Sequence, residues 1–219
     1  SLLEREREAR ARAELDERQA VELQHVTAAL AAAETAQDVA QVVVGQLIGA
    51  IGGMGGSLFV VDEETAALRM VDHASYPQDV TDDDRLVPLT RKLPPTDALR
   101  AGGPVLFSDL EAFRATYPEV VDEVGLGDPE RGSAWAHVPL FVGTRAVGML
   151  TVAYAEPQPF DRRQRDALVS ICDAVAQALR RAELYEAERE ARLLAELLQS
   201  HAGLLAAAAT SRDVARTTI

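Results

Sequence analysis

The fold is decided by one stretch, Ser133–Leu179, which reads SAWAHVPLFVGTRAVGMLTVAYAEPQPFDRRQRDALVSICDAVAQAL. Two apolar runs, Ser133–Val142 and Arg145–Ala155, flank the dipeptide Gly143-Thr144, a pattern that predicts a β-hairpin with a two-residue turn. Asp161 is a good N-cap for the helical pattern that follows, in which apolar residues recur on one face. The sequence therefore predicts an antiparallel hairpin that leads into a long helix.

A regular hairpin around this turn fixes which side chains share a face. The predicted cross-strand pairs are Val142 with Arg145, Leu140 with Val147, and Val138 with Met149. One face then carries Trp135, His137, Leu150, Val152 and Tyr154. The other face carries Ala134, Ala136, Val138, Val147, Met149 and Ala153. Because both faces are largely apolar, we expect both to be covered, and the face with small aliphatic residues suits close helix packing.

Upstream of the hairpin, apolar and β-branched runs bounded by turn residues predict further strands and shorter helices. The expected strands are Ser57–Asp62, Ala67–Ala74, Pro104–Phe107 and a short piece near Leu86–Leu89. The expected helices are Ala36–Ile51, Pro95–Ala101 and Leu110–Ala115. This order of elements is an α+β arrangement built on an antiparallel sheet.

Three stretches together resemble a known family: GGSLFVVDEETAALRMV at Gly55–Val71, LTRKLPPTDALRAGGPVLFSDL at Leu89–Leu110, and Ser133–Leu179 itself. In this order they are similar to the GAF domain, a small-molecule sensory fold related to PAS domains. The resemblance implies an α+β, GAF/PAS-like antiparallel sheet with helices packed on one face, flanked by long coiled-coil signalling helices. In GAF domains the opposite face looks onto a cavity roofed by an irregular segment, here about residues 76–127.

The resemblance thus implies a ligand pocket over the face that carries Trp135. The expected lining residues are Phe59, Met70, Phe107, Trp135, His137, Leu150, Val152 and Tyr154. A few polar groups among apolar walls is the usual composition of a small-molecule site. The alternative, a cavity filled by its own aromatic side chains, stays open at this point.

The chain ends predict rods that pair with a second copy. Residues 1–30 are rich in Glu, Arg, Ala and Leu, and the helical period continues far beyond Leu179, to a length of about 40 residues. A seven-residue apolar spacing favours a homodimer interface, parallel or antiparallel. Its expected residues are Leu23, Val26, Leu30, Leu184, Leu194, Leu198, His201 and Leu205.

An internal repeat indicates a tandem array. Leu30–Ala40 and Leu205–Ala215 match at eight of eleven positions, with an offset of 205 − 30 = 175 residues. The predicted organisation is a linker helix over 1–30, a GAF domain over 31–182, a second linker helix over 183–205, and the truncated start of a second GAF-like copy over 206–219. We expect the chain to be a piece of a larger, cytoplasmic, bacterial signalling protein.

Composition excludes several function classes. The net charge of −13 argues against binding nucleic acid or an anionic membrane, and no apolar run reaches the length of a membrane span. The single cysteine, Cys172, excludes an internal disulfide framework and is not placed where bilin-binding GAF domains carry their cysteine. The cysteines of GAF-type methionine sulfoxide reductases and the motif of cyclic-nucleotide GAF domains are absent. Asp82-Asp83-Asp84 is interpreted as a solvated turn.

The sequence therefore favours a regulatory sensor and dimerisation module whose small-molecule pocket is coupled to linker helices that control an output domain. An alternative is a ligand-free structural dimerisation spacer in a tandem array. A minor alternative is a haem- or metal-binding redox sensor that uses His137 and His73. Because no nucleophile, metal or phosphate motif is found, we do not expect this fragment to be an enzyme. No cofactor is required, and the sequence does not identify the ligand.

Overall fold

The computed structural model describes residues 10, 17, 20–74, 85–123, 125–126 and 128–217, except for the side chains of residues 129, 200 and 202–217. It divides into two compact units, the first ending at Ala182 and the second beginning at Glu183. The first unit holds the sheet and the helices around it. Within the described residues, no helix combines the length and the hydrophobicity that a membrane span requires.

A six-stranded antiparallel sheet forms the centre of the first unit, with strand order β3-β2-β1-β6-β5-β4. The strands are β1 (Gly55–Asp62), β2 (Ala67–Ala74), β3 (Leu86–Pro88), β4 (Val105–Phe107), β5 (Ala134–Val142) and β6 (Arg145–Tyr154). The hairpin turn between β5 and β6 is Gly143-Thr144, and Gly143 has a φ of 62°, which favours glycine. The predicted strands and their antiparallel arrangement are confirmed.

The predicted register of this hairpin is wrong beyond its first pair. Val142 pairs with Arg145 as expected, but an irregularity between Leu140 and Phe141 shifts the remaining pairs by one residue. The observed pairs after the shift include Leu140–Gly148, Val138–Leu150, His137–Thr151, Ala136–Val152 and Ala134–Tyr154. Because side chains alternate along a strand, the shift moves every later residue of β6 to the opposite face from the one predicted.

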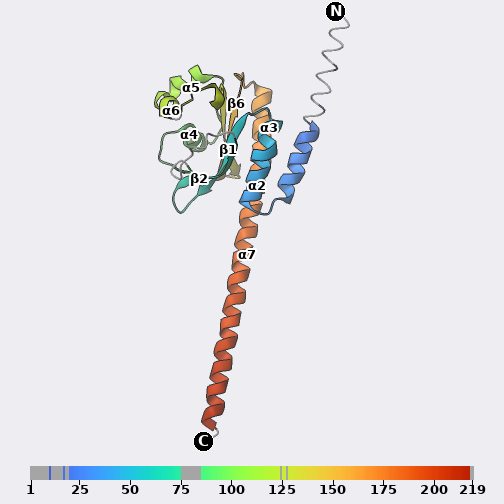
Figure 1. Ribbon diagram of the computed structural model, residues 1–219, viewed down its shortest axis with the longest axis vertical. Coiled ribbons are helices and arrows are strands. Elements are labelled where there is room, and N and C mark those ends of the chain that lie inside the picture. Colours follow the sequence, from blue (N-terminus) through green and yellow to red (C-terminus); the bar gives the residue numbers. More distant parts are fainter. Residues whose placement is uncertain are drawn as a thin grey trace, which may run out of the picture. The chain divides into compact units, whose positions relative to one another are not determined.

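One face of the sheet is covered by long helical segments, seen beside β1 in Figure 1. They are residues 20–32, the segment α2 (Ala36–Val42), η1 (Val43–Leu47) and α3 (Ile48–Ala50), and the first part of α7 (Arg162–Thr217). Buried residues of all of them share one apolar core with Leu58, Leu150 and Val152 of the sheet. This confirms the prediction that helices pack on one face.

Two capping boxes fix where these helices begin. The hydroxyl of Thr35 accepts a hydrogen bond from the Asp38 N–H at 3.1 Å, and the Asp38 carboxylate accepts one from the Thr35 N–H at 2.9 Å. These bonds hold the pKa of Asp38 below its usual value. At the start of α7, Asp161 and Gln164 exchange the same two bonds at 2.8 and 2.9 Å. The predicted N-cap at Asp161 is therefore confirmed.

The other face of the sheet is roofed by three short helices, α4 (Pro94–Ala101), α5 (Leu110–Thr116) and α6 (Pro118–Glu123). Proline begins α4, and the chain leaves it through Gly102 at a φ of 68°. The Asp109 side chain caps α5 by accepting a hydrogen bond from the Ala112 N–H at 2.8 Å. The helix α6 was not among the expected helices, although its first residue, Pro118, is well suited to a first helical turn.

The helix α7 is longer than the sequence predicted. It spans 56 residues, against an expected length of about 40, because it passes Gly203 without a break. The two halves of the sequence repeat therefore differ in structure. Residues 30–40 contain a break at 33–35 before α2 begins, whereas residues 205–215 are helical throughout within α7.

Candidate functional site

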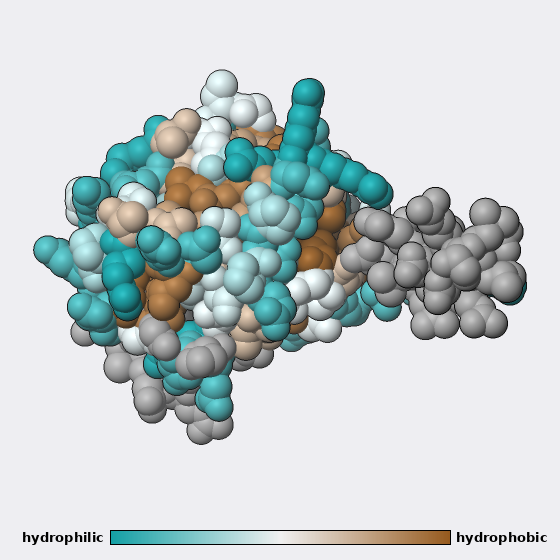
Figure 2. All heavy atoms as spheres, turned by 90° about the horizontal axis from the view of Figure 1, so that it is seen from above, coloured by the Kyte–Doolittle hydropathy of each residue, from teal (hydrophilic) through white to brown (hydrophobic). Residues whose placement is uncertain are grey.

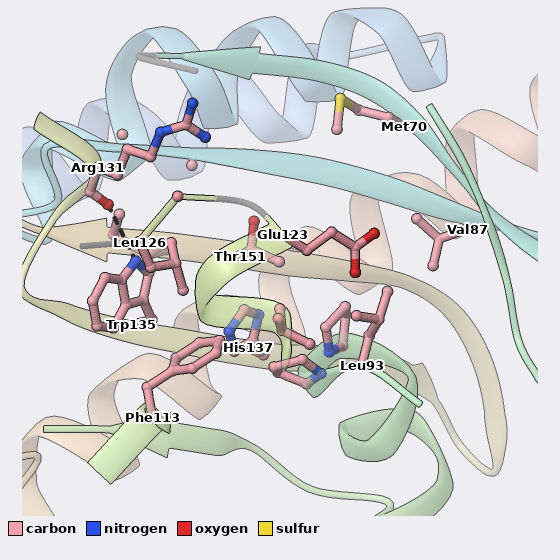
Figure 3. Close-up of a pocket in the computed structure, with 18 of the residues that line it drawn as sticks. Met70, Val87, Leu93, Phe113, Glu123, Leu126, Arg131, Trp135, His137 and Thr151 are labelled. Atoms are coloured by element: carbon pink, nitrogen blue, oxygen red, sulfur yellow. Dashed lines mark hydrogen bonds between the residues drawn. The ribbon is translucent and has the colours of Figure 1, made fainter. Parts of the chain in front are cut away.

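A cavity of about 530 Å³ lies on the sheet face that α4–α6 roof. Strands β1, β2, β5 and β6 supply its floor, while the β3–α4 connection, α5, α6 and the segment after α6 supply its walls. Figure 3 shows Met70, Val87, Leu93, Phe113, Leu126 and Trp135 around this space. The mainly apolar lining and the size are those of a small-molecule site.

The floor of the cavity carries a short row of polar side chains across three neighbouring strands. Ser57 of β1 pairs with Thr151 of β6, and Thr151 pairs in turn with His137 of β5. The hydroxyl oxygens of Ser57 and Thr151 are 2.6 Å apart, so these two buried side chains satisfy each other. Thr151 and His137 line the cavity, and Ser57 lies fully buried beside them.

His137 differs from its neighbours because its ring nitrogens make no hydrogen bond to the described residues. It is 9% exposed, and neither ring nitrogen has a hydrogen-bond partner among the described residues. Burial lowers the pKa of His137 from 6.5 to about 3, because a charged imidazole would be poorly solvated there. The ring is therefore neutral at physiological pH and offers one donor and one acceptor.

An aromatic cluster supports the histidine from one side. The rings of Phe107 and Phe113 lie 6.2 and 6.4 Å from the His137 ring in edge-on orientations, and Trp135 meets Phe113 at 5.2 Å. The indole N–H of Trp135 donates to the Arg131 carbonyl at 3.2 Å, the dashed line in Figure 3. With its N–H paired, the indole presents an apolar ring to the cavity.

Two polar contacts hold the roof together. The guanidinium of Arg91, before α4, forms an ion pair with the carboxylate of Glu123 in α6, and both residues line the cavity. Deeper in the roof, the Tyr117 hydroxyl donates to the Asp97 carboxylate at 2.5 Å, which joins α4 to the end of α5. Burial and this carboxylate raise the pKa of Tyr117. The remaining charged residues of the lining are Asp122, Glu130 and Arg131.

Of the eight predicted pocket residues, the structure places five in the cavity lining: Phe59, Met70, Trp135, His137 and Val152. Phe107 belongs to the aromatic cluster behind His137 rather than to the lining. Leu150 and Tyr154 were assigned to the wrong face. Both are buried in the core under α7, because the shift at Leu140 turns β6 over.

The same shift explains why the sequence did not predict the cavity residues of β6. Thr151 and Ala153 occupy the places on β6 that a regular hairpin would give to Leu150 and Val152. Roof residues such as Arg91, Leu93, Glu123 and Leu126 come from the segment that had been treated as irregular. A tertiary contact such as the Arg91–Glu123 pair leaves no local sequence signal.

The predicted interface residues fall into two groups. Val26 and Leu30 are each only 3% exposed because they pack into the core of their own domain, with Leu23 against them, and Arg181 Nη2 donates to the Leu30 carbonyl at 2.9 Å. This corrects their assignment to a dimer interface. Leu184, Leu194 and Leu198 are 53%, 59% and 63% exposed on α7, and His201 is exposed too. The Leu205 side chain lies outside the described part.

The described residues hold no cluster of three or more potential metal ligands. The single cysteine of the chain, Cys172, lies in the core on the helical side of the sheet, and burial raises its pKa to about 12. His73 lies on β2 and is not in the cavity lining. The triple-Asp segment at 82–84 lies outside the described residues.

On the surface, the face seen in Figure 2 carries its hydrophobic side chains in small separate areas between hydrophilic ones. The cavity is therefore the more specific feature of the first unit, because scattered apolar surface is ordinary in a folded domain.

Comparisons with solved structures show the same fold. A GAF domain of a phosphoenolpyruvate-protein phosphotransferase from Coxiella burnetii matches 77% of this chain and 96% of its own length, with a TM-score of 0.64 and 16% identity. The corresponding domain from Acinetobacter gives a TM-score of 0.61 at 16% identity, covering 76% and 95%. The free methionine-R-sulfoxide reductase of Neisseria meningitidis gives 0.55 at 18% identity, covering 74% and 88%.

No curated protein sequence is similar enough to count as a match. The family model for the GAF domain matches residues 33–180, about two thirds of the 219-residue chain. This match, the fold and the strand order agree, so the chain belongs to the GAF domain family.

Proposed function

We propose that this domain is a sensor module of a multidomain signalling protein, in which a small molecule in the cavity biases the packing of α7. The single observation that carries the proposal is the cavity of about 530 Å³ with an unsatisfied, buried histidine on its floor. A filled core would not leave both the space and the unmet polar group. This favours a ligand site over a ligand-free spacer.

The route from the cavity to α7 runs through strands β5 and β6. His137 and Thr151 face the cavity, while their chain neighbours Ala136 and Leu150 face the helical core. Leu168, Cys172, Val175 and Leu179 of α7 are buried in that same core. Because a close-packed core does not deform freely, a small displacement of the two strands is transmitted to the helix.

Relatives support a regulatory role in general. Domains of similar fold occur in a putative two-component sensor histidine kinase protein from Sinorhizobium meliloti, with a TM-score of 0.52, and in a methyl-accepting chemotaxis protein, with a TM-score of 0.58. The described lining of the cavity contains no cysteine. The one cysteine of this chain is buried on the opposite face of the sheet from the cavity.

We propose further that α7 pairs with the α7 of a second copy. Leu184, Leu194 and Leu198 share one seven-residue frame and are each more than half exposed, and Leu193 and Leu197 widen the same apolar surface. Apolar residues at a seven-residue spacing suit a coiled-coil seam, and a second copy of α7 presents the same spacing.

The sensor proposal is tested by thermal shift across a metabolite panel, followed by hydrogen exchange on the full chain. We expect a compound that raises the melting temperature also to change amide exchange over residues 168–182 of α7. Exchange changes confined to the cavity lining would contradict the coupling. No shift with any compound would support the spacer instead.

A further inference from the structure

The buried polar side chains of this domain can be checked one by one. Within the described part of the chain, the buried polar residues are Ser57, Thr96, His137 and Thr151. Ser57 and Thr151 bond to each other, and Thr96 accepts from the Leu93 N–H at 3.1 Å and donates to a carbonyl of the same loop. His137 alone among these four has no partner in the described residues. Its desolvation is therefore uncompensated by the part of the chain that the structure describes.

The position of His137 indicates what supplies the missing bond. The side chain is about nine-tenths buried, yet it lines the cavity, where Figure 3 shows it between Phe113 and the roof loop that carries Leu93. A neutral imidazole offers an N–H donor on one nitrogen and a lone pair on the other. A molecule seated in the cavity that presents a matching N–H, O–H or C=O group would satisfy it.

The charges of the site argue against a charged ligand. Among the described lining residues, no ionised side chain lies on the floor, where the polar residues are Thr151 and His137. The charged lining residues belong to the wall and roof: Arg91, Arg131, Asp122, Glu123 and Glu130, two cationic and three anionic groups. Arg91 is already paired with Glu123. The described lining therefore has no surplus positive charge for a phosphate or carboxylate, and the floor would not solvate a cation.

The walls indicate the shape of the ligand. Phe59, Phe113 and Trp135 line the cavity from three different elements, and Met70, Val87 and Leu93 fill the space between them. Flat aromatic side chains around a cavity favour a flat, apolar ring system over a flexible chain.

We propose that the cavity takes an uncharged, planar heteroaromatic molecule, and that His137 selects it by a hydrogen bond to a ring N–H or carbonyl group. This inference rests on the proposed function, because it assigns a ligand class to the same cavity. His137 is then a specificity-determining residue. Without ligand its buried imidazole carries an uncompensated desolvation penalty, and a hydrogen bond to the ligand offsets that penalty.

The experiment uses two fluorescent probes with related ring systems on the full chain. Lumichrome is an uncharged tricycle with ring N–H and carbonyl groups, and flavin mononucleotide carries a comparable tricycle with an ionised phosphate. We expect lumichrome to bind the wild type at least about ten-fold more tightly than flavin mononucleotide. His137→Leu should weaken lumichrome binding about ten-fold or more, because one good hydrogen bond is lost. The matched control His25→Leu, at an exposed position in the helical segment 20–32, should leave affinity unchanged.

A second measurement separates recognition from a structural role. Without probe, His137→Leu should melt at the same temperature as the wild type or higher, because the variant removes an unsatisfied polar group. A lower melting temperature would show that His137 supports the fold and would overturn the proposal. Failure of lumichrome to bind the wild type, or equal affinity in His137→Leu, would overturn it too. A Soret band with haemin that His137→Leu abolishes would assign the histidine to iron instead.

These outcomes are distinct from those of the sensor proposal. Lumichrome binding that depends on His137 but leaves exchange over residues 168–182 unchanged would uphold the ligand class and contradict the coupling. A compound that changes exchange over residues 168–182 but binds equally well to His137→Leu would uphold the coupling and contradict the role of His137 in selecting the ligand.

Discussion

His137 and Thr151 lie directly opposite each other in the β5–β6 pair, on the floor of one cavity, and they differ in how their polar atoms are satisfied. The Thr151 hydroxyl is 2.6 Å from that of Ser57, whereas the ring nitrogens of His137 have no partner among the described residues. The domain thus keeps one buried polar group unsatisfied at the place where a ligand would contact it.

The first prediction concerns pH. The folded-state pKa of His137 is about 3 and the unfolded value is 6.5, so between these values the unfolded chain binds the extra proton. Stability should therefore fall as pH falls through this range. We expect His137 to account for a loss of about 2 kcal/mol between pH 7 and pH 5. Urea unfolding of wild type and His137→Leu at both pH values isolates this contribution, because other groups titrate equally in both proteins. Parallel pH dependence in the two proteins would contradict it.

The second prediction concerns the close approach of β6 to β1. A Cβ added at Gly148 would overlap the carbonyl oxygen of Phe59, and backbone in mid-sheet cannot move aside cheaply. Gly148→Ala should lower the free energy of unfolding by about 2–4 kcal/mol. The control is Gly103→Ala, where an added Cβ meets nothing within 4 Å. Equal melting temperatures for the two variants would show that the register around Gly148 is wrong.

The third prediction separates the two groups of leucines. Leu30 is 3% exposed in the core, so Leu30→Ala should cost about 2–4 kcal/mol of stability. Leu198 is 63% exposed, so Leu198→Ala should leave the melting temperature of the dilute protein nearly unchanged. Thermal unfolding at one low protein concentration compares the two. A small effect at Leu30 would return this residue to the interface that the sequence predicted.

The fourth prediction concerns self-association. Leu198→Asp places a charge in the proposed seam of α7 and should shift the protein toward monomer in sedimentation velocity. Gln199→Asp adds the same charge at the next position, which is exposed and lies outside the seven-residue frame, and should leave the mass unchanged. If wild type and both variants sediment with one common mass, α7 does not pair through this frame.

The sequence predicted most of the strands and the helix face because these depend on local patterns. The hairpin could be predicted from the turn at Gly143-Thr144 and the alternation of β5, and the start of α7 from the cap at Asp161. It did not predict the irregularity at Leu140, since both faces of β6 are apolar and alternation alone does not choose between them. That one shift accounts for the misplacement of Leu150 and Tyr154 and for the omission of Thr151.

The packing of the helical segment 20–32 could not be predicted from local sequence patterns either. A seven-residue apolar spacing marks a buried stripe but not what covers it, so Val26 and Leu30 fitted a dimer seam as well as their own core. Likewise, Leu30–Ala40 and Leu205–Ala215 share their sequence, yet the first breaks before α2 and the second continues as helix. Tertiary packing decides between such alternatives.

The central claim, that the cavity is occupied by a small molecule in its working state, is tested most directly by native mass spectrometry of the full chain as purified from cells. The account predicts that wild type carries a small organic adduct, released on denaturation, and that His137→Leu carries less of it while His25→Leu carries the same amount. A clean polypeptide mass for wild type, together with no thermal shift across a metabolite panel, would contradict the account.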